Sequence, residues 1–360
     1  MVIPRYQLLP EGQDGQFHCI SRCVRRACLC GWDSYCHKNF DHRKVWIVNR
    51  LKILSQVFAI EVVGYSVMEN HLHTLLRVRG DRLLSWSDQE VARRWLNICP
   101  VRRNSQGNPM DPNELEIDLI ASDPERVKEL KQRLVSISWF NRFLKEQIAK
   151  RANGEDGCTG RFWEGRFKSV ALLNEAAVLA CLQYIDLNPI RAGIAETPEQ
   201  SDFTSAQDRI VAWQARSKLE LVKTKRGNEE KAEERTQDRE QFMILQAQKE
   251  VTRDAWLTPF RSSHIEDEKL VLSMTCESYL ELLDWTGRQL KENKRGKIPE
   301  QLEAILIRLD IETKEWLNTV EHFENLFSRV AGSLKTFLKA AHRVGQKWLK
   351  GKAQGKVAFG

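Results

Sequence analysis

Alternating and continuous apolar positions indicate two neighbouring buried strands in the first quarter of the chain. Apolar residues dominate 61–68 and 71–78, and only Glu69 and Asn70 separate these two segments. Strands separated by two residues pair most simply as an antiparallel hairpin. Residues 17–24 show strand character as well, which predicts a further strand ahead of this hairpin.

Helical periodicity flanks the predicted hairpin on both sides. Asp41 is expected to cap a first helix, and a second helix is expected over 125–151. The apolar residues that define the buried faces are Val45, Val48, Leu51, Leu54 and Phe58 in the first helix, and Leu130, Leu134, Ile137, Phe140 and Leu144 in the second. These two helices would cover the sheet.

A strand over 169–173 and a helix from Asn174 to Asn188 complete the pattern, because Pro189 disfavours helical geometry in the residue before it. The order is strand, helix, strand, strand, helix, strand, helix. The first six elements are the split βαβ arrangement of a ferredoxin-like domain, an antiparallel sheet covered by helices. The sequence therefore predicts an α+β fold with one appended helix.

The chain of 360 residues divides into three parts by composition. Residues 1–210 hold the predicted sheet domain, with a polar insertion at about 80–123. Charge dominates 211–254, which predicts a linker or a solvated helix. Residues 255–360 have helical periodicity and predict an α-helical C-terminal region. One of its helices carries a row of cations that could hold a phosphate backbone or simply face solvent: Lys335, Lys339, Arg343 and Lys347.

Composition restricts the partners and the compartment. The 56 Lys and Arg exceed the 49 Asp and Glu, and the pI near 8.9 favours a polyanionic partner such as nucleic acid. We expect a soluble, cytoplasmic protein without a membrane partner, since no long apolar stretch or signal-peptide pattern is present. Nine cysteines, an odd number, fit reduced thiols.

A group of cysteines near the N-terminus raises the alternative of a structural zinc site. The residues are Cys23, Cys28, Cys30, Cys36 and His37. Their spacing, C-x4-C-x-C-x5-C-H, lacks the paired C-x2-C knuckles that fold around tetrahedral zinc. Structural zinc is therefore the less favoured interpretation of this segment.

The main candidate for chemistry is the pair His71 and His73. Side chains two residues apart in a strand project to the same face. Buried imidazoles need partners, and a divalent metal would satisfy both while leaving positions open for substrate. Histidines that are satisfied by other core groups are the alternative.

The last helix of the sheet domain could supply a third ligand and a nucleophile. Tyr184 and Asn188 are four residues apart and share one helical face, and the small Ala177 and Ala180 are expected to leave room there for substrate. A His-His-Asn site would polarise a phosphate, and a phenolate attacking phosphorus would form a covalent phosphotyrosine. Because that bond retains the energy of the phosphodiester, the step suits strand transfer. An ordinary core tyrosine is the alternative.

These segments resemble a known family. His71-Leu72-His73, preceded by Val67-Met68-Glu69-Asn70, resembles the His-hydrophobic-His motif of the HUH endonucleases. The run Tyr-Ile-Asp-Leu-Asn-Pro-Ile-Arg-Ala-Gly at 184–193 resembles the nucleophile segment of their single-tyrosine transposases, in particular the REP-associated tyrosine transposases. Residues 162–167 resemble the aromatic and basic segment that precedes it. The resemblance spans about residues 15–210.

The resemblance implies a DNA nickase and strand transferase that acts on single-stranded DNA next to a hairpin. Tyr184 would be the nucleophile that forms a 5′-phosphotyrosine and leaves a free 3′ hydroxyl. His71, His73 and Asn188 would bind Mg²⁺ or Mn²⁺. The insertion and the helices beyond about residue 255 have no counterpart in compact members. The sequence leaves open whether one chain builds the site or a homodimer exchanges helices.

Basic and aromatic residues at the predicted sheet edges fit the same substrate, because cations contact phosphates and rings stack on unpaired bases. They are Arg22, Arg25, Arg26, Arg161, Trp163, Arg166 and Lys168. Burial in the core is the alternative for Trp163. Two other functions remain open at this point: a transposase-derived regulator that binds DNA hairpins without catalysis, and a metal phosphohydrolase that uses a water nucleophile.

Overall fold

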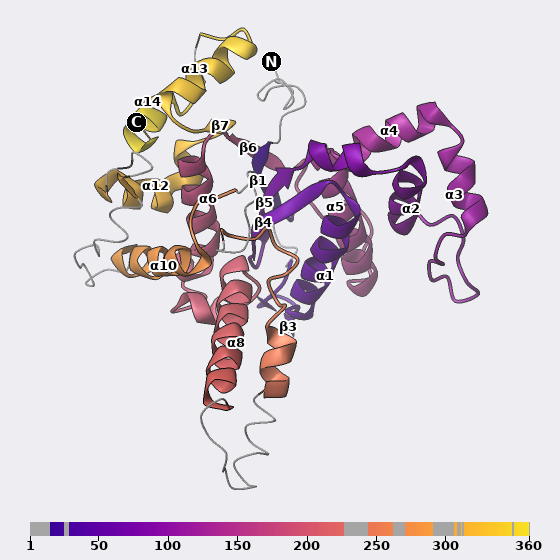
Figure 1. The fold of residues 1–360 in the computed structure, drawn as a ribbon, viewed down its shortest axis with the longest axis horizontal. Coiled ribbons are helices and arrows are strands. Elements are labelled where there is room, and N and C mark those ends of the chain that lie inside the picture. Colours follow the sequence, from indigo (N-terminus) through magenta and orange to yellow (C-terminus); the bar gives the residue numbers. More distant parts are fainter. Residues whose placement is uncertain are drawn as a thin grey trace, which may run out of the picture.

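A five-stranded sheet lies at the centre of the molecule, with helices on both faces (Figure 1). The computed structural model describes residues 15–24, 29–226, 244–261, 271–290, 306–307, 311, 313–347 and 349–359. The strands follow the order β4-β5-β1-β6-β7 across the sheet. Their bounds are β1 (Gln16–Arg22), β4 (Ile60–Val67), β5 (His71–Val78), β6 (Lys168–Leu172) and β7 (Val330–Ala331).

The pairing of the first four strands is antiparallel throughout, in the order of a ferredoxin-like sheet. The predicted hairpin is present as β4 and β5. The short strand β7, which comes from the C-terminal region, pairs parallel to β6 and makes the sheet mixed. The predicted α+β fold is thus confirmed, and its sheet has one strand more than the sequence indicated.

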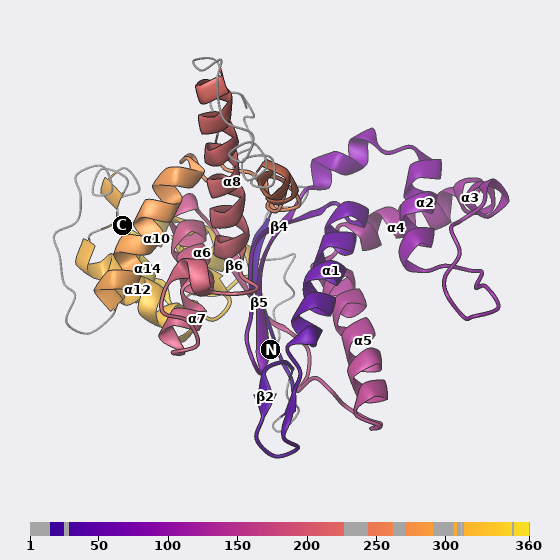
Figure 2. The ribbon, with the colours of Figure 1, turned by 90° about the horizontal axis from the view of Figure 1, so that it is seen from below.

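The helices form a layer on each face of the sheet (Figure 2). Helices α1 (His42–Val57) and α5 (Ile137–Glu155) pack against each other on one face. Helix α6 (Glu175–Asp186) covers the other face over β4, β5 and β6, and the short α7 (Asn188–Arg191) follows it. Every residue from Ala176 to Asp186 is buried, so α6 lies between the sheet and a further layer of helices.

The predicted helix over 125–151 is two helices, α4 (Pro124–Leu134) and α5. Ser136 has an extended backbone between them, and its hydroxyl accepts a hydrogen bond from the Trp139 amide at 3.5 Å. A serine in this role begins a new helix, because it satisfies a backbone donor that has no partner within the helix. The helical spacing of apolar residues continues from α4 into α5 without interruption. The sequence pattern therefore gave no sign of the break between the two helices.

Two details of α1 differ from the sequence expectation. Asp41 precedes the helix, but its side chain makes no capping bond and instead pairs with Lys44 at 2.7 Å. Val45 was expected on the buried face and is 46% exposed, whereas Ile47 is fully buried. The core therefore meets α1 on a face rotated slightly from the one that the sequence indicated.

The insertion forms an arm beside the sheet domain (Figure 1). It contains the 3-10 turn η2 (Gly80–Ser85) and the helices α2 (Asp88–Ile98) and α3 (Glu114–Ala121), with α4 packed against both helices. A capping box at Asn113 begins α3, which the sequence analysis did not predict. A small hairpin of β2 (Trp32–Asp33) and β3 (Lys38–Asn39) lies elsewhere on the chain.

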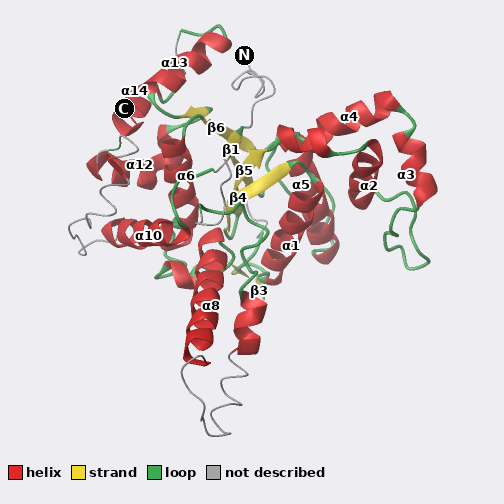
Figure 3. Cartoon of the chain, in the orientation of Figure 1, coloured by secondary structure: helices red, strands yellow, loops and turns green. Residues whose placement is uncertain are grey.

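The described C-terminal region consists mainly of helices (Figure 3). They are α10 (Cys276–Leu290), α12 (Thr313–Leu326), α13 (Leu334–Arg343) and α14 (Lys352–Phe359). Helix α8 (Ser205–Arg226) precedes this region and follows the turn η3 (Pro198–Gln200). The helix that was predicted to carry the row of four cations is α13, which ends at Arg343, so Lys347 lies beyond it. None of the helices in the described ranges is long and apolar enough to cross a membrane.

A buried carboxylate joins the sheet domain to these helices. Asp186, at the end of α6, accepts hydrogen bonds from the Ser205 hydroxyl at 2.6 Å and from the Tyr279 hydroxyl of α10 at 2.5 Å. The amide of Ala206 donates a third bond at 3.1 Å. Burial raises the pKa of Asp186, and these donors, together with the charge of Arg209, lower it in part. The network fixes the C-terminal end of α6, where Tyr184 lies.

Candidate active site

Three histidines share the face of the sheet that α6 covers. On the neighbouring strand β1, Ile20 is paired with His73 and Arg22 with His71. Directly paired residues of antiparallel strands have side chains on the same face. His18, two residues before Ile20, therefore joins them, and its ring centroid lies 5.1 Å from that of His73. The rings of His71 and His73 are 4.7 Å apart.

Local sequence brings α6 close to this face. The side chain of Asn174 accepts a hydrogen bond from the Ala177 amide at 3.1 Å and begins the helix. On the facing strand β4, Gly64 has no side chain, and a Cβ there would lie 2.2 Å from Cδ1 of Leu182. Because the glycine permits this close approach, the helix lies near enough for Tyr184 to reach the histidines.

The structure places the four predicted site residues together within one chain. The ring of Tyr184 lies 5.6 Å from that of His73, nearly perpendicular to it. The amide nitrogen of Asn188 lies 2.9 Å from Nε2 of His73. His71 is half-buried at the edge of the cluster, with Nδ1 2.5 Å from the side-chain oxygen of Asn70. The catalytic and metal-binding roles of these residues stay predictions.

His18 is a member of the cluster that the sequence analysis missed. Its Nε2 lies 2.9 Å from Nδ1 of His73. Nε2 of His73 accepts a hydrogen bond from the Asn188 amide, so the neutral ring carries its proton on Nδ1. This N–H group donates a hydrogen bond to Nε2 of His18. A histidine that binds a metal through Nε2 needs this tautomer and this kind of support. Side chains alternate between the two faces along β1, and this alternation places His18 on the same face as Ile20. The sequence shows the alternation but does not show that β1 lies beside β5.

Burial sets the charge state of the histidines. It lowers the pKa of His18 to about 3 and that of His71 to about 4. The pKa of His73 is also well below its ordinary value, because the ring is fully buried and lies beside the other two histidines. All three rings are therefore neutral near pH 7, which is the form of imidazole that binds metal ions.

The donor set fits a divalent ion with open positions. His71 and His73 offer ring nitrogens, and Asn188 offers a neutral amide oxygen once its side chain turns toward the same point. Three protein ligands leave coordination positions for substrate and water. In the described part of the chain, no group of three or more His, Cys, Asp or Glu side chains is placed to hold a metal ion. A carboxylate therefore does not complete the set.

The cysteine-rich segment does not form a zinc site among the described residues. The thiol of Cys30 lies 3.0 Å from the carbonyl oxygen of Met68, and the thiol of Cys23 lies 3.2 Å from that of Asn70. Cys36 is exposed, and Cys28 lies outside the described residues. The thiols of Cys23 and Cys30 thus bond to the turn between β4 and β5, just before His71.

Two charged residues flank the hydroxyl of Tyr184. The hydroxyl donates a hydrogen bond to Oε2 of Glu324 at 3.2 Å, and the guanidinium of Arg191 lies 4.8 Å from the ring centroid. Burial and the charge of Glu324 raise the pKa of Tyr184 to about 12, whereas Arg191 lowers it in part. The tyrosine is therefore a protonated phenol near neutral pH. Sequence reasoning assigned no role to either charged residue.

Helix α12 of the C-terminal region closes this side of the cluster. The ring of Phe323 lies 5.9 Å from that of Tyr184 and 6.1 Å from that of His18. Ala177 and Ala180 were expected to leave open space beside the tyrosine, but both are fully buried. The small side chains allow close packing around α6 rather than an opening for substrate.

The predicted DNA-contacting residues are distributed unevenly. Arg22, Arg161, Arg166 and Lys168 are exposed, whereas Arg25 and Arg26 lie outside the described residues. Trp163 is only 7% exposed, and its indole nitrogen donates to the carbonyl of Lys145 at 2.9 Å. Its ring is therefore part of the core, which was the alternative for this residue, and it is not placed to stack on a base.

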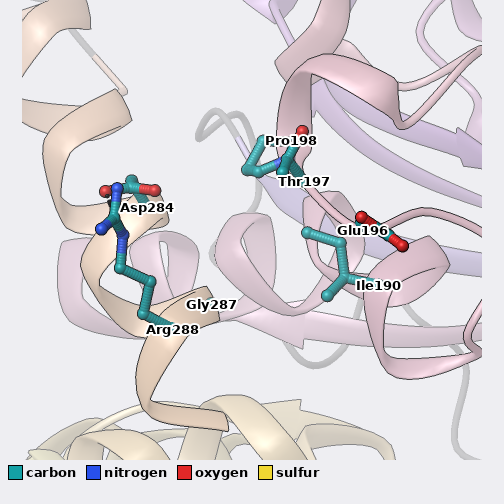
Figure 4. A pocket seen from close by; sticks show the side chains of 7 residues that line it. All are labelled: Ile190, Glu196, Thr197, Pro198, Asp284, Gly287 and Arg288. Atoms are coloured by element: carbon teal, nitrogen blue, oxygen red, sulfur yellow. Dashed lines mark ion pairs between the residues drawn. The ribbon is translucent and has the colours of Figure 1, made fainter. Parts of the chain in front are cut away.

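A separate pocket lies between α10 and the segment that follows α7 (Figure 4). It is lined by Ile190, Glu196, Thr197, Pro198, Asp284, Gly287 and Arg288. Arg288 is paired with Asp284 at 2.8 Å, so its charge is compensated. None of the four predicted site residues lines this pocket, and it is distinct from the histidine cluster.

Comparisons with known proteins give a distant likeness. No family model matches the sequence, and no curated protein matches it. A solved structure described as the REP-associated tyrosine transposase bound to a REP hairpin is similar, with a TM-score of 0.31 and 12% identity. The match covers 53% of this chain and 76% of that one. A likeness at this level carries no conclusion about activity.

Proposed function

We propose that this protein cleaves and rejoins single-stranded DNA beside hairpins, in a metal-dependent reaction with Tyr184 as the nucleophile. One observation carries the proposal. The phenol ring packs 5.6 Å from His73, and Nε2 of His73 faces the Asn188 amide at 2.9 Å. A candidate nucleophile thus lies beside a candidate His-His-Asn donor set, and this arrangement suits metal-assisted phosphoryl transfer.

His71, His73 and Asn188 are the residues that would hold Mg²⁺ or Mn²⁺. When bound, the ion would polarise the scissile phosphate and stabilise the negative charge that develops on its oxygens. His18 acts through His73, because its hydrogen bond fixes the tautomer and the orientation of that ring.

The other residues of the site would bind and orient the DNA strand. Arg22, Lys168 and Arg191 are exposed around the cluster. Arg22 of β1 lies opposite His71 of β5, and Lys168 of β6 lies opposite Ile20 of β1. Their positive charges can contact phosphates on either side of the cleaved bond. In the proposed reaction, the oxygen of Tyr184 forms a bond to phosphorus, and the 3′ oxygen of the preceding nucleotide leaves.

The product of this reaction is a covalent adduct that survives denaturation. We would incubate the protein with Mn²⁺ and 3′-labelled single strands that tile the DNA on both sides of its coding sequence, and detect the adduct on a denaturing gel. Tyr184→Phe should abolish the adduct. Tyr35→Phe, which makes the same change at an 80% exposed tyrosine, should form it at the wild-type rate.

Other results would exclude the proposal. If Tyr184→Phe still forms the adduct, another residue is the nucleophile. If phosphodiester cleavage continues without an adduct in this variant, the protein is a hydrolase that uses water. If the wild type binds the strands but does not cut them with Mg²⁺ or Mn²⁺, it is a binding protein. An adduct that persists in excess chelator would exclude the metal.

A further inference from the structure

Glu324 is the acidic side chain that contacts the hydroxyl of Tyr184. It lies on α12, which packs against α6 although 140 residues separate the two side chains in sequence (Figure 1). The hydroxyl donates to Oε2 at 3.2 Å. The other carboxylate oxygen, Oε1, lies 3.7 Å from the ammonium group of Lys168. The carboxylate therefore lies between the proposed nucleophile and a surface cation.

A tyrosine that attacks phosphorus must lose its proton as the new bond forms. A general base for this step needs to lie within about 2.6–3.2 Å of the phenol oxygen. The nearby imidazole of His73 is not available, because both of its ring nitrogens already have partners. Arg191 is a cation and cannot accept the proton. Among the described residues around this hydroxyl, Glu324 has both the required position and a basic atom.

We propose that Glu324 is the general base for DNA cleavage by Tyr184 and the general acid for rejoining. This inference rests on the proposed function. In cleavage, the phenol proton moves to Oε2 of Glu324 while the tyrosine oxygen bonds to phosphorus. The bond between phosphorus and the 3′ oxygen breaks, and that oxygen keeps the electron pair and takes a proton from water. In rejoining, the 3′ hydroxyl loses its proton to water as its oxygen bonds to phosphorus, the bond between phosphorus and the tyrosine oxygen breaks, and Glu324 returns its proton to the departing tyrosine oxygen.

The surroundings of Glu324 suit this role better than a purely structural one. Its side chain is 32% exposed, so it can exchange a proton with solvent between the two steps. Lys168 is 79% exposed, and its positive charge offsets the repulsion between the carboxylate and an incoming phosphate. Phe323, the preceding residue, packs on Tyr184 and holds this part of α12 against the nucleophile.

The test compares the rate of adduct formation with the affinity for DNA. Glu324→Gln keeps the shape and a hydrogen-bond acceptor but removes the base. We expect its single-turnover adduct rate, with Mn²⁺ and saturating protein on the strand that wild type cleaves, to fall by about 10²–10⁴-fold. Its affinity for the uncut strand should stay within about threefold of wild type. Glu321→Gln makes the same charge change at a half-exposed position of α12, and its rate should not change.

Chemical rescue separates a base from a structural acceptor. Glu324→Ala should be as slow as Glu324→Gln, and sodium formate should restore part of its rate when sodium chloride at equal ionic strength does not. A Gln variant within threefold of the wild-type rate, or faster, would overturn the proposal, and a faster one would show that Glu324 blocks the nucleophile. Absence of formate rescue would overturn it as well. If the wild type forms no adduct, the proposed function itself fails.

Discussion

The absence of a side chain at Gly64 is what allows α6 to carry Tyr184 to the histidines, and Gly64→Ala tests this. A Cβ at this position would lie 2.2 Å from Cδ1 of Leu182 and 3.0 Å from the hydroxyl of Ser205. Carbon atoms prefer separations of about 3.5–4.0 Å, so the helix or the leucine must move by roughly 1.5 Å. Leu182 is fully buried and has little room to rotate.

We expect two measurable effects of Gly64→Ala. Overpacking of this kind lowers the free energy of unfolding by about 1–3 kcal/mol, measured by urea denaturation with tryptophan fluorescence. A shift of about 1 Å between a nucleophile and its supporting groups can lower the rate by about 10²-fold, measured as adduct formation. Gly80→Ala is the matched control, because a Cβ there would meet no atom within 4 Å beyond its own chain neighbours. Its unfolding free energy should change by less than about 0.5 kcal/mol.

A double-mutant cycle locates the effect. Leu182→Ala removes the atom that the new methyl group at position 64 would meet, so it should cost less stability in the Gly64→Ala background than in the wild type. The coupling energy should reach about 1 kcal/mol. If Gly64→Ala is as stable and as active as Gly80→Ala, or if the two substitutions are additive, the close approach at Gly64 does not position α6 and our reasoning is wrong.

Two further predictions concern buried polar groups. Tyr279→Phe removes a hydrogen-bond donor from the buried Asp186 and should lower the free energy of unfolding by about 1.5–3 kcal/mol, measured by urea denaturation. Tyr35→Phe, at the surface, should leave this free energy unchanged. Equal urea midpoints for the two variants would exclude a stabilising role for the bond between Tyr279 and Asp186. Histidines of the unfolded chain bind protons near pH 6.5, but His18 and His71 resist protonation in the fold until the pH reaches about 3 and about 4. The metal-free protein should therefore lose stability as the pH falls from about 6.5 toward 4. A His18→Gln/His71→Gln double variant should lose less stability, when urea midpoints are compared at pH 7.5 and 5. Equal losses in the two proteins would contradict the burial of neutral rings.

Sequence patterns were sufficient for the elements that repeat a local signal. The hairpin of β4 and β5 follows from two apolar segments that only two residues separate, and helix α6 follows from its flanking Asn174 and Pro189. The HUH-like spacing indicated His71, His73, Tyr184 and Asn188, which the structure brings together. In contrast, the break before α5 depends on one serine hydroxyl within a continuous apolar period. Periodicity alone does not report such a cap.

The rest of the site depends on contacts between distant parts of the chain. His18 joins the cluster only because β1 lies beside β5 in the sheet. Glu324 reaches Tyr184 through the packing of α12 on α6, and nothing in the sequence around residue 324 indicates that contact. The strand β7 has two residues, too few for an alternating pattern. Strand order and helix packing are tertiary properties, so local rules do not predict them.

The parallel pairing of β7 with β6 has a consequence for biosynthesis. Ribosomes release the N-terminal part of a protein first, and domains begin to fold during translation. The sheet can form once residue 172 has emerged, but β6 keeps an unpaired edge until Val330 and Ala331 are made. Glu324 is made only a few residues earlier. A nascent chain would therefore carry the histidines and Tyr184 well before the carboxylate that contacts Tyr184. Under the proposed mechanism, Tyr184 would gain its base only late in synthesis.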